Sequence, residues 1–583
     1  MPEKHTAKLG KRPEANLFQL LKPYTFLISL LVLLTVVSNG LNLAVPQILA
    51  HAIDSFTQGN FVFTTVILQF LLVAISIFIF TYLQNIAQVY ASERVAKDLR
   101  TELIAKISVQ DYAYIQRANP AKLLTNLTSD VDAVKSFVAQ AIASMISSIF
   151  LIFGASILLL LINWKLALAI LLAVPVIATV FYVILGKVRK LFRKQQEAID
   201  WLNKVINESI LGSGLIRLLN SQQYEYQKFF DANDEAKNIG LSILRLFASL
   251  IPVITFVTNM ATLTILALGG NFVISGGMSL GDFTAFNSYL AILIFPILII
   301  GFMSNVIAQA QASYQRIVEV TKAEHKKDIG HLTTKLHGDI EIKNVFMTFG
   351  EKMALKDVSF SLKAGTKTAI IGPTAAGKTQ LLYTLIGLIE PTSGTVEYDG
   401  KSLDQYQKQS MHHQVGFVFQ DSIIFNLTLR ENIAFSNTVK DKDLQKAIAT
   451  AELQDFIDTL PDKLDTVVSE RGTSLSGGQK QRVMLARALA LNPKILLLDD
   501  FTARVDTKTE QKVLKNVQEN YPDITLISVT QKIASIEHYD QIILLMEGEI
   551  LAAGKHAELM EKSPEYVQIY NSQQSTNNYE LHA

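Results

Sequence analysis

The stretch GPTAAGKT, residues Gly372–Thr379, decides the fold of the C-terminal half of this 583-residue chain. It matches G-x-x-x-x-G-K-[ST], a phosphate-binding loop whose flexible backbone turns successive N–H groups toward a phosphate. The strand-like TKTAIIG precedes it and the helix-like KTQLLYTLIGLI follows, a context that an accidental glycine-rich turn would not require. Lys378 is expected to reach the terminal phosphates, and the Thr379 hydroxyl to ligate Mg²⁺. The residues predicted to surround the phosphates are Gly372, Thr374, Ala375, Ala376, Gly377, Lys378 and Thr379.

Two adjacent carboxylates follow a second apolar run in ILLLDDFTARVD, residues Ile495–Asp506. Four aliphatic residues in a row predict a buried strand, and Asp499 and Asp500 stand where it emerges, the place where open α/β sheets bind ligands. A turn with a helix cap is the alternative, because Asp favours both. Beside a phosphate-binding loop, an Asp that ends an apolar strand usually ligates the nucleotide's Mg²⁺. We therefore expect Asp499 to be a metal ligand.

The patterns around these stretches predict two domains. Short strand patterns such as DIEIKNVFMTF and LKDVSFSL alternate with helices, which indicates an α/β nucleotide-binding domain over residues 339–573. The polar segment 321–338 is typical of a linker, and residues 574–583 are expected to form a disordered tail. Residues 1–320 are predicted to be a transmembrane domain with six spans and long cytoplasmic helical loops.

Composition supports the membrane domain. Charged residues make up 18% of the chain and hydrophobic ones 49%, against roughly 25% charged in soluble proteins. A soluble helical core is the alternative, but its helices would need a polar face, which SILLLLIN and LALAILLAVPVIATVFYVIL lack. Each apolar stretch is near the ~20 residues that cross a bilayer. The predicted spans are Tyr24–Ala50, Phe61–Leu83, Phe137–Ile162, Leu166–Leu185, Leu246–Leu268 and Phe283–Phe302.

Charge and cysteine content exclude several classes of function. The net charge of +1 provides no overall basic field for nucleic acid, so no nucleic-acid partner is expected. The chain has no cysteine, which excludes disulfides, thiol catalysis and Cys-based zinc sites. The first apolar run is far longer than a signal-peptide core, so no cleavable signal is expected.

Basic residues set the predicted orientation in the membrane. The segment before the first span and the connections after spans two and four are rich in Lys and Arg, whereas DSFTQGN and GGNFVISGGMSLGD have neither. Basic segments remain in the cytoplasm, which places both termini and the nucleotide-binding domain there, in a multi-pass protein of the cell membrane. The two long basic connections read as helical, as in ASERVAKDLRTELIAKI, so spans two to five are expected to continue beyond the bilayer as helical arms. A separate small globular domain in each connection is the alternative, and it would need strands.

The segment LSGGQ, Leu475–Gln479, resembles the signature sequence of ATP-binding-cassette (ABC) proteins. The resemblance extends over essentially the whole chain, because six spans followed by one cassette resemble an ABC exporter half-transporter. It implies an α-helical membrane domain joined to an α/β P-loop cassette, with ATP and Mg²⁺ as cofactors. It also implies that two cassettes clamp head to tail around two ATP molecules. The residues that would then serve the ATP bound to the partner are Ser476, Gly477, Gly478 and Gln479, which without this context would be a common turn.

Other positions match family landmarks in order. Phe349 stands where an aromatic ring usually stacks on adenine, although it could be strand core. Gln420 in VGFVFQD resembles the glutamine that joins the metal site and faces the membrane arms, although it could be an exposed loop amide. The segment VVSERG precedes the signature as in exporters. Tyr112–Gln116, at the turn of an arm, is expected to couple transport to hydrolysis.

The sequence departs from the family at two catalytic positions. Family members that hydrolyse ATP usually carry Glu where this chain has Asp500, and His where it has Gln531. Asp is one methylene shorter than Glu, so its carboxylate ends roughly 1.5 Å, one C–C bond, before the position that a Glu carboxylate would reach. A misplacement of about 1 Å can cost ~10²-fold in rate. Gln cannot carry the imidazole's charge. The pattern predicts an ATP site that binds well and turns over poorly.

An intact signature in the same chain as two altered catalytic positions is a pattern that resembles one subunit of a heterodimeric ABC exporter. In such an exporter the partner half-transporter supplies Glu and His at these positions. The loop ARVD also departs from the family, in which this loop usually consists of small residues. The sequence leaves two alternatives for Arg504: contact with a phosphate or exposure to solvent. The leading hypothesis is ATP-driven export of an amphipathic drug-like or lipid compound. The alternatives are an ATP-gated or regulatory membrane subunit, or an importer built on the exporter fold.

The hypothesis about the cargo rests on the inner thirds of the spans, which have no Lys, Arg, Asp or Glu. Aromatic, Met and amide side chains in or just after span six suit a lipophilic cargo, although the aromatic rings could instead face lipid. These residues are Phe286, Asn287, Phe295, Met303 and Asn305.

Overall fold

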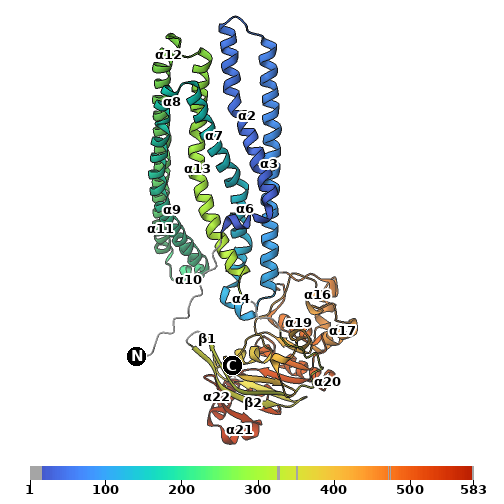
Figure 1. The fold of residues 1–583 in the computed structure, drawn as a ribbon. Coiled ribbons are helices and arrows are strands. Elements are labelled where there is room, and N and C mark those ends of the chain that lie inside the picture. The colour runs from blue at the N-terminus through green and yellow to red at the C-terminus, as the bar shows by residue number, and fades with distance from the viewer. Residues whose placement is uncertain (1–15, 325–328, 350–351, 470–471, 473, 581–583) are drawn as a thin grey trace, which may run out of the picture. The chain divides into compact units, whose positions relative to one another are not determined.

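The computed structural model describes residues 16–324, 329–349, 352–469, 472 and 474–580. The chain divides into two compact units, of which the first comprises Met1–Val109 with Ala118–Glu324 (Figure 1). The second comprises His325–Ala583 together with Gln110–Arg117. The predicted division at 321–338 therefore differs in one respect: a short segment of the membrane half belongs with the nucleotide-binding half. Tyr112 of this segment contacts an aromatic residue of the second unit, as described below.

The first unit contains six helices that are long and apolar enough to cross a membrane, which confirms the six predicted spans. Several of them include short turns or breaks. Their bounds are Lys22–Thr57, Phe63–Ser108, Pro120–Ile162, Trp164–Leu211, Gln222–Ile274 and Leu280–Thr321. In Figure 1 the main parts are α2 (Thr25–Thr57), α3 (Phe63–Ser108), α7 (Ile142–Ile162), α9 (Ala173–Leu211), α11 (Gln222–Thr264) and α13 (Leu280–Thr321). The shorter helices in this unit are α1 (Leu17–Leu20), α5 (Pro120–Thr125), α6 (Val131–Ser136), α8 (Trp164–Leu171), α10 (Ser213–Leu218) and α12 (Gly270–Ile274).

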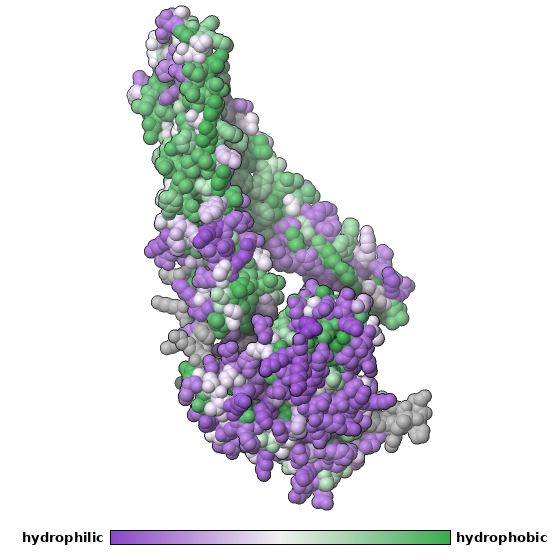
Figure 2. Space-filling view, turned by 90° about the vertical axis from the view of Figure 1, so that its right-hand side faces the viewer, coloured by the Kyte–Doolittle hydropathy of each residue, from purple (hydrophilic) through white to green (hydrophobic). Residues whose placement is uncertain are grey.

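Hydrophobic side chains cover the outside of these helices rather than being confined to their contacts. Figure 2 shows a continuous hydrophobic surface along them, with hydrophilic residues gathered toward the helix ends. Phe70, Phe78 and Phe153 are among the large apolar residues that are more than half exposed. A water-soluble bundle would bury such side chains, whereas hydrocarbon is their favourable solvent. The chain is accordingly a multi-pass membrane protein.

The helices pair along much of their length. Helix α2 packs on α3, α9 packs on α11, and α13 packs on both α7 and α2. Helix α3 alone has 46 residues, about twice the length that crosses a bilayer. The extra length carries the basic segments, which confirms that the spans continue as helices beyond their apolar parts.

The second unit is an α/β structure with two sheets. The six-stranded sheet has the order β10-β9-β3-β8-β7-β6, in which β9, β3, β8, β7 and β6 run parallel and β10 pairs antiparallel with β9. The four-stranded antiparallel sheet has the order β2-β1-β4-β5. The strands are β1 (Ile340–Phe349), β2 (Lys352–Leu362), β3 (Lys367–Ile371), β4 (Ser393–Tyr398), β5 (Lys401–Ser402), β6 (Val415–Val418), β7 (Ile495–Asp499), β8 (Thr525–Val529), β9 (Gln541–Met546) and β10 (Glu549–Gly554).

The apolar runs of the sequence form the middle of the larger sheet. Successive residues of a strand point to opposite faces, so a strand covered on both sides is apolar throughout. Leu496 and Leu498 belong to one buried cluster, and Ile495 and Leu497 to another. The principal helices of this unit are α4 (Tyr112–Ala118), α14 (Lys378–Leu385), α16 (Leu429–Ile433), α17 (Asp441–Thr450), α19 (Gly477–Leu489), α20 (Thr507–Asn520), α21 (His556–Lys562) and α22 (Pro564–Glu580).

Helix α22 corrects the prediction of a disordered tail over 574–583. It continues to Glu580, while residues 581–583 lie outside the described part of the chain. The polar composition of this segment suggested disorder, but it contains neither Gly nor Pro to break a helix. Tyr566, which is fully buried, fixes the first turn, so the remaining turns extend an existing helix rather than start a new one.

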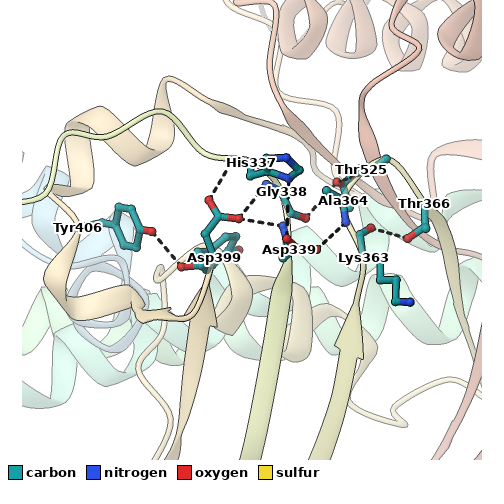
Figure 3. A network of polar contacts seen from close by, with 11 residues as sticks. His337, Gly338, Asp339, Lys363, Ala364, Thr366, Asp399, Tyr406 and Thr525 are labelled. Carbon is teal, nitrogen blue, oxygen red and sulfur yellow. Dashed lines mark hydrogen bonds and ion pairs between the residues drawn. The ribbon is translucent and has the colours of Figure 1, made fainter.

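The end of the predicted linker is hydrogen-bonded to the small sheet. The Asp399 carboxylate, in the turn after β4, accepts the backbone N–H groups of His337, Gly338 and Asp339 at 2.7, 3.0 and 3.0 Å (Figure 3). The Asp339 carboxylate in turn accepts the N–H of Ala364 at 2.9 Å. Before them, Leu332 forms a parallel bridge with Tyr406. The cassette thus holds residues that composition assigned to a free linker.

We expect Asp399→Ala to lower the unfolding free energy of the second unit by about 1–3 kcal/mol, because three N–H groups lose a charged acceptor. Asp399 also has a φ of 51°, a left-handed conformation that Asp and Asn tolerate better than Ala does. Thermal unfolding of the purified protein measures the change. Asp399→Asn, which keeps one acceptor oxygen, is the matched variant and should lose less. An unchanged unfolding midpoint for Asp399→Ala would contradict this role.

Candidate nucleotide-binding site

The phosphate-binding loop joins β3 to α14 as predicted. Gly377 has a φ of 99°, and a Cβ atom there would lie 2.5 Å from the Ala354 carbonyl oxygen, so only glycine fits. Ala375 is also left-handed, with a φ of 66°. A non-glycine residue in this conformation costs of order 1 kcal/mol and is typical of functional loops. These two backbone conformations make the tight turn that precedes the N-terminus of α14.

Lys378 begins α14, and its side chain folds back over the loop. Its Nζ donates hydrogen bonds to the Gly372 and Pro373 carbonyl oxygens, each at 2.8 Å. Burial lowers the pKa of this ammonium group, while the carboxylates of Asp499 and Asp500 oppose that shift. The lysine therefore places a positive charge in the loop, where phosphate oxygens are expected.

Thr379 and Asp499, two of the predicted metal ligands, lie side by side. The Thr379 hydroxyl donates to Asp499 Oδ1 at 3.2 Å, while Asp499 Oδ2 is buried and has no hydrogen-bond partner among the described residues. Burial raises the pKa of the Asp499 carboxyl to about 6. A buried oxygen without a partner, beside a hydroxyl oxygen, suits a hard cation such as Mg²⁺. The residues present fit this ion, which would neutralise phosphate charge.

Asp500 and Gln531 lie at the same edge of the sheet. Asp500 follows β7 with a φ of 49°, and its N–H donates to the Val529 carbonyl of β8 at 3.0 Å. Burial raises the pKa of the Asp500 carboxyl, while the positive charges of Lys378 and Lys532 lower it. The backbone of Asp500 is thus tied to the neighbouring strand, which fixes the origin from which its short side chain reaches.

One pocket brings most of the predicted residues together. It has a volume of about 100 Å³, too small for a whole nucleotide, and so corresponds to the phosphate end of the site. Two further residues, Gln380 and Val529, line it without having been predicted. The predicted lining residues are Thr374, Ala375, Ala376, Gly377, Lys378, Thr379, Gln420, Asp499, Asp500 and Gln531.

Other predicted residues lie elsewhere. Gly372 enters the phosphate-binding loop from β3 but does not line this pocket. Phe349 is the last residue of β1, and its side chain, like Glu470 and Arg471 of VVSERG, lies outside the described part of the chain. The signature residues are not in the pocket either, as expected if they serve a second nucleotide.

The signature forms the N-terminus of α19. The Ser476 hydroxyl accepts the Gln479 N–H at 3.3 Å, and the Gln479 side chain accepts the Ser476 N–H at 2.8 Å, which together make a capping box. A Cβ atom at Gly477 would lie 3.2 Å from Arg504 Cδ. The glycine therefore lets the Arg504 side chain pack beside the helix N-terminus, a place for Arg504 that the sequence left open.

Comparison with known proteins agrees with this arrangement. Residues 28–297 match the family described as "ABC transporter transmembrane region", and residues 355–503 match the family described as "ABC transporter". The "Uncharacterized ABC transporter ATP-binding protein YfiB" of Bacillus subtilis (strain 168) is 31% identical over 95% of this chain and 97% of its own length. This chain belongs to the ABC transporter family. It is accordingly a transport ATPase.

Further relatives place the chain among half-transporters. The "Probable multidrug resistance ABC transporter ATP-binding/permease protein YheI" of the same organism is 29% identical over 95% of this chain and 96% of its own length. A solved structure described as a bacterial Atm1-family ABC exporter with ATP bound superposes with a TM-score of 0.78 at 24% identity, covering 95% of this chain and 99% of that one. The ABC transporter fold thus covers nearly the whole chain.

The sequence did not reveal how the segment Gln110–Arg117 joins the cassette of this ABC transporter. The Tyr112 ring lies 5.5 Å from the Tyr383 ring in an edge-to-face contact. Tyr383 is on α14, directly after the phosphate-binding loop, and its ring also contacts that of Phe419, 6.0 Å away. Phe419 precedes Gln420. The aromatic residues in YAYIQ and FVFQ were the available signal, but their proximity depends on tertiary structure.

Proposed function

We propose that this chain is one subunit of a heterodimeric ABC exporter that moves amphipathic drug-like or lipid compounds out of the cytoplasm. In this proposal its own ATP site binds nucleotide and hydrolyses it poorly, and its signature completes the competent site on the partner. The observation that carries the proposal is the presence of Asp500 and Gln531 in the same pocket as an intact phosphate-binding loop. The partner is a second half-transporter with Glu and His at these two positions.

The structure of the pocket supports nucleotide binding without efficient turnover. Lys378, Thr379 and Asp499 provide the charge and oxygen ligands that phosphates and Mg²⁺ require. The base position is different, because the Asp500 backbone is tied to Val529 and the carboxylate is one methylene shorter than Glu. A base must come within hydrogen-bonding distance of the water it activates. A short side chain on a fixed backbone does not meet this requirement.

The cargo is inferred from the first unit. A pocket of about 460 Å³ lies between α7, α9 and α13, within the range of drug-sized sites. It is mostly apolar, with Phe181, Tyr182 and Gly301 in its lining and Arg189 contributing a charge. Such a lining suits a compound with a large apolar part and a polar end.

The residues of α13 that the sequence associated with cargo are not equivalent. Phe286 is fully buried in the helix core, so its assignment to a cargo path is wrong, whereas the exposed Phe295 and Asn305 stay candidates. The cause is packing, because Phe286 belongs to the cluster of Tyr289, Leu290 and Leu293. Asn287 and Met303 are half-buried and also stay candidates.

Transport in sealed vesicles tests the proposal. Vesicles that contain this chain and its partner should show ATP-dependent, vanadate-sensitive flux of a lipophilic dye from the nucleotide-binding side to the other side. Vesicles with only one of the two subunits are the control. Flux down a gradient without hydrolysis would instead indicate an ATP-gated channel, and flux toward the nucleotide-binding side would indicate an importer.

Lys378→Ala should weaken labelling of this chain by a photoreactive ATP analogue about ten- to a hundredfold, because charge-assisted hydrogen bonds to the phosphates are lost. The measurement is labelling as a function of analogue concentration. Lys401→Ala, which removes an exposed lysine of β5, is the matched control and should label normally. Normal labelling of a folded Lys378→Ala variant would contradict the assignment of the ATP site.

Tyr112→Ala and Gln420→Ala should separate transport from hydrolysis. Removing the edge-to-face contact between Tyr112 and Tyr383 costs about 0.5–1.5 kcal/mol, enough for a loss of coupled transport of up to roughly tenfold. Nucleotide labelling and basal ATPase activity should change little in Tyr112→Ala, whereas Gln420→Ala, at a residue that lines the pocket, should lower basal ATPase activity as well but reduce transport more. Tyr224→Ala, at an exposed position of α11, is the control. A strictly proportional fall in transport and basal hydrolysis would show that these residues do not couple the two processes.

A further inference from the structure

The C-terminal helix contacts the loop that carries Gln531. One face of α22 places Tyr566, Ile569, Tyr570 and Gln573 in line, at the spacing of successive helical turns. Tyr566 is fully buried, and Ile569 and Tyr570 pack against the same hydrophobic core. These contacts fix the helix, so the polar residue at the end of this face has a defined position.

The Gln573 side-chain amide makes two hydrogen bonds to the backbone of this loop. Its Nε2 donates to the Gln531 carbonyl oxygen at 2.6 Å, and its Oε1 accepts the Ile533 N–H at 2.9 Å. A side-chain amide that binds a backbone C=O and N–H in this way acts as a strand-like partner of the segment. Gln531 lines the phosphate end of the ATP site, so one of the two hydrogen bonds is made to a residue of the pocket itself.

The neighbouring residues of the loop have other contacts. The Lys532 N–H donates to Thr530 Oγ1 at 3.1 Å, and the Thr530 N–H donates to the Ile370 carbonyl of β3 at 3.3 Å. These bonds hold the loop where it leaves the sheet. The contact with Gln573 instead holds it from the side of the C-terminal helix, at a residue that lines the pocket.

We propose that Gln573 is a positioning residue that sets the Gln531 loop against bound nucleotide and thereby slows nucleotide release from this chain. The inference rests on the proposed assignment of the pocket to ATP, but not on the identity of the partner or the cargo. It gives α22 a part in nucleotide retention. A glutamine is required, because a carboxylate cannot donate to the Gln531 carbonyl and an apolar side chain can make neither bond.

The test uses the full-length chain in lipid nanodiscs and the release of fluorescent MANT-ATP in the presence of Mg²⁺. Gln573→Met keeps the length of the side chain but loses both hydrogen bonds, so release should be about tenfold faster. Gln573→Glu keeps the acceptor but places a carboxylate against a carbonyl oxygen, so release should be faster still. Association rates should stay at wild-type values, and the unfolding temperature should fall slightly in both variants, because each loses at least one hydrogen bond to the backbone.

Gln574→Met is the matched control, because Gln574 is the exposed neighbour on the same helix and donates to the Tyr570 hydroxyl rather than to the loop. It should release MANT-ATP at the wild-type rate. Hydrogen exchange provides a second measurement. The Ile533 amide should exchange faster in Gln573→Met than in the wild-type chain, and at the wild-type rate in Gln574→Met.

The outcomes distinguish this inference from the proposed function. If the wild-type chain binds MANT-ATP and Gln573→Met releases it at the wild-type rate, the positioning role is wrong while the ATP site stands. Equal release rates for Gln573→Met and Gln573→Glu would overturn it in favour of simple packing. A wild-type chain that binds no MANT-ATP would overturn both.

Discussion

Exchange of Ser476 for Ala in this chain should lower ATP hydrolysis by the heterodimer about a hundredfold, although Ser476 belongs to the subunit with the impaired acid. In the proposed head-to-tail arrangement the Ser476 hydroxyl and the amides at the N-terminus of α19 hold the γ-phosphate of ATP bound to the partner. Loss of one donor at developing transition-state charge costs of order 10²–10³ in rate. The affected rate is that of the competent site, so most of the activity is lost.

The loss of a helix cap has to be separated from the loss of a phosphate contact. Ser476 forms a capping box with Gln479, and its removal also destabilises α19 by about 1 kcal/mol. Thr428 forms the same motif with Glu431 at α16, away from both nucleotides in the proposal. Thr428→Ala is therefore the matched control. Equal ATPase rates for Ser476→Ala and Thr428→Ala would contradict the proposed role of the signature.

Purified without its partner, this chain should hydrolyse ATP at about a hundredth of the heterodimer's rate, because any self-dimer contains only sites with Asp500 and Gln531. In the heterodimer, exchange of the partner's catalytic Glu for Gln should remove nearly all activity. Asp500→Asn should change the rate by less than about threefold, since its site contributes little turnover. ATPase assays of the isolated chain, the heterodimer and the two acid variants measure these differences.

A bridging water is the main way in which this asymmetry could fail. If an extra water extended the reach of the Asp500 carboxylate, the isolated chain would hydrolyse ATP as fast as the heterodimer. Equal losses from the two acid variants would lead to the same conclusion. Vanadate trapping of labelled nucleotide provides a control, because it should mark the partner's phosphate-binding loop rather than Lys378 of this chain.

The sequence was sufficient wherever a function depends on neighbours along the chain. Gly372–Thr379 predicted the phosphate-binding loop because the Gly377 backbone makes the turn, and Lys378 and Thr379 begin the helix directly after it. The six spans were predicted because a bilayer is crossed by a continuous apolar segment, whatever its neighbours are. The apolar run before Asp499 placed that carboxylate at a strand end, since a strand buried on both faces has no other composition.

Tertiary structure decided what depends on residues that are distant in sequence. The contacts of Asp399 with His337 and of Tyr112 with Tyr383 join segments separated by 62 and 271 positions, and local patterns do not encode such pairs. Phe286 looked like a cargo residue until packing placed it in the core. The contact of Gln573 with the Gln531 loop was not predicted either, because a hydrogen bond requires a donor and an acceptor to meet in space, and the fold alone brings these two together.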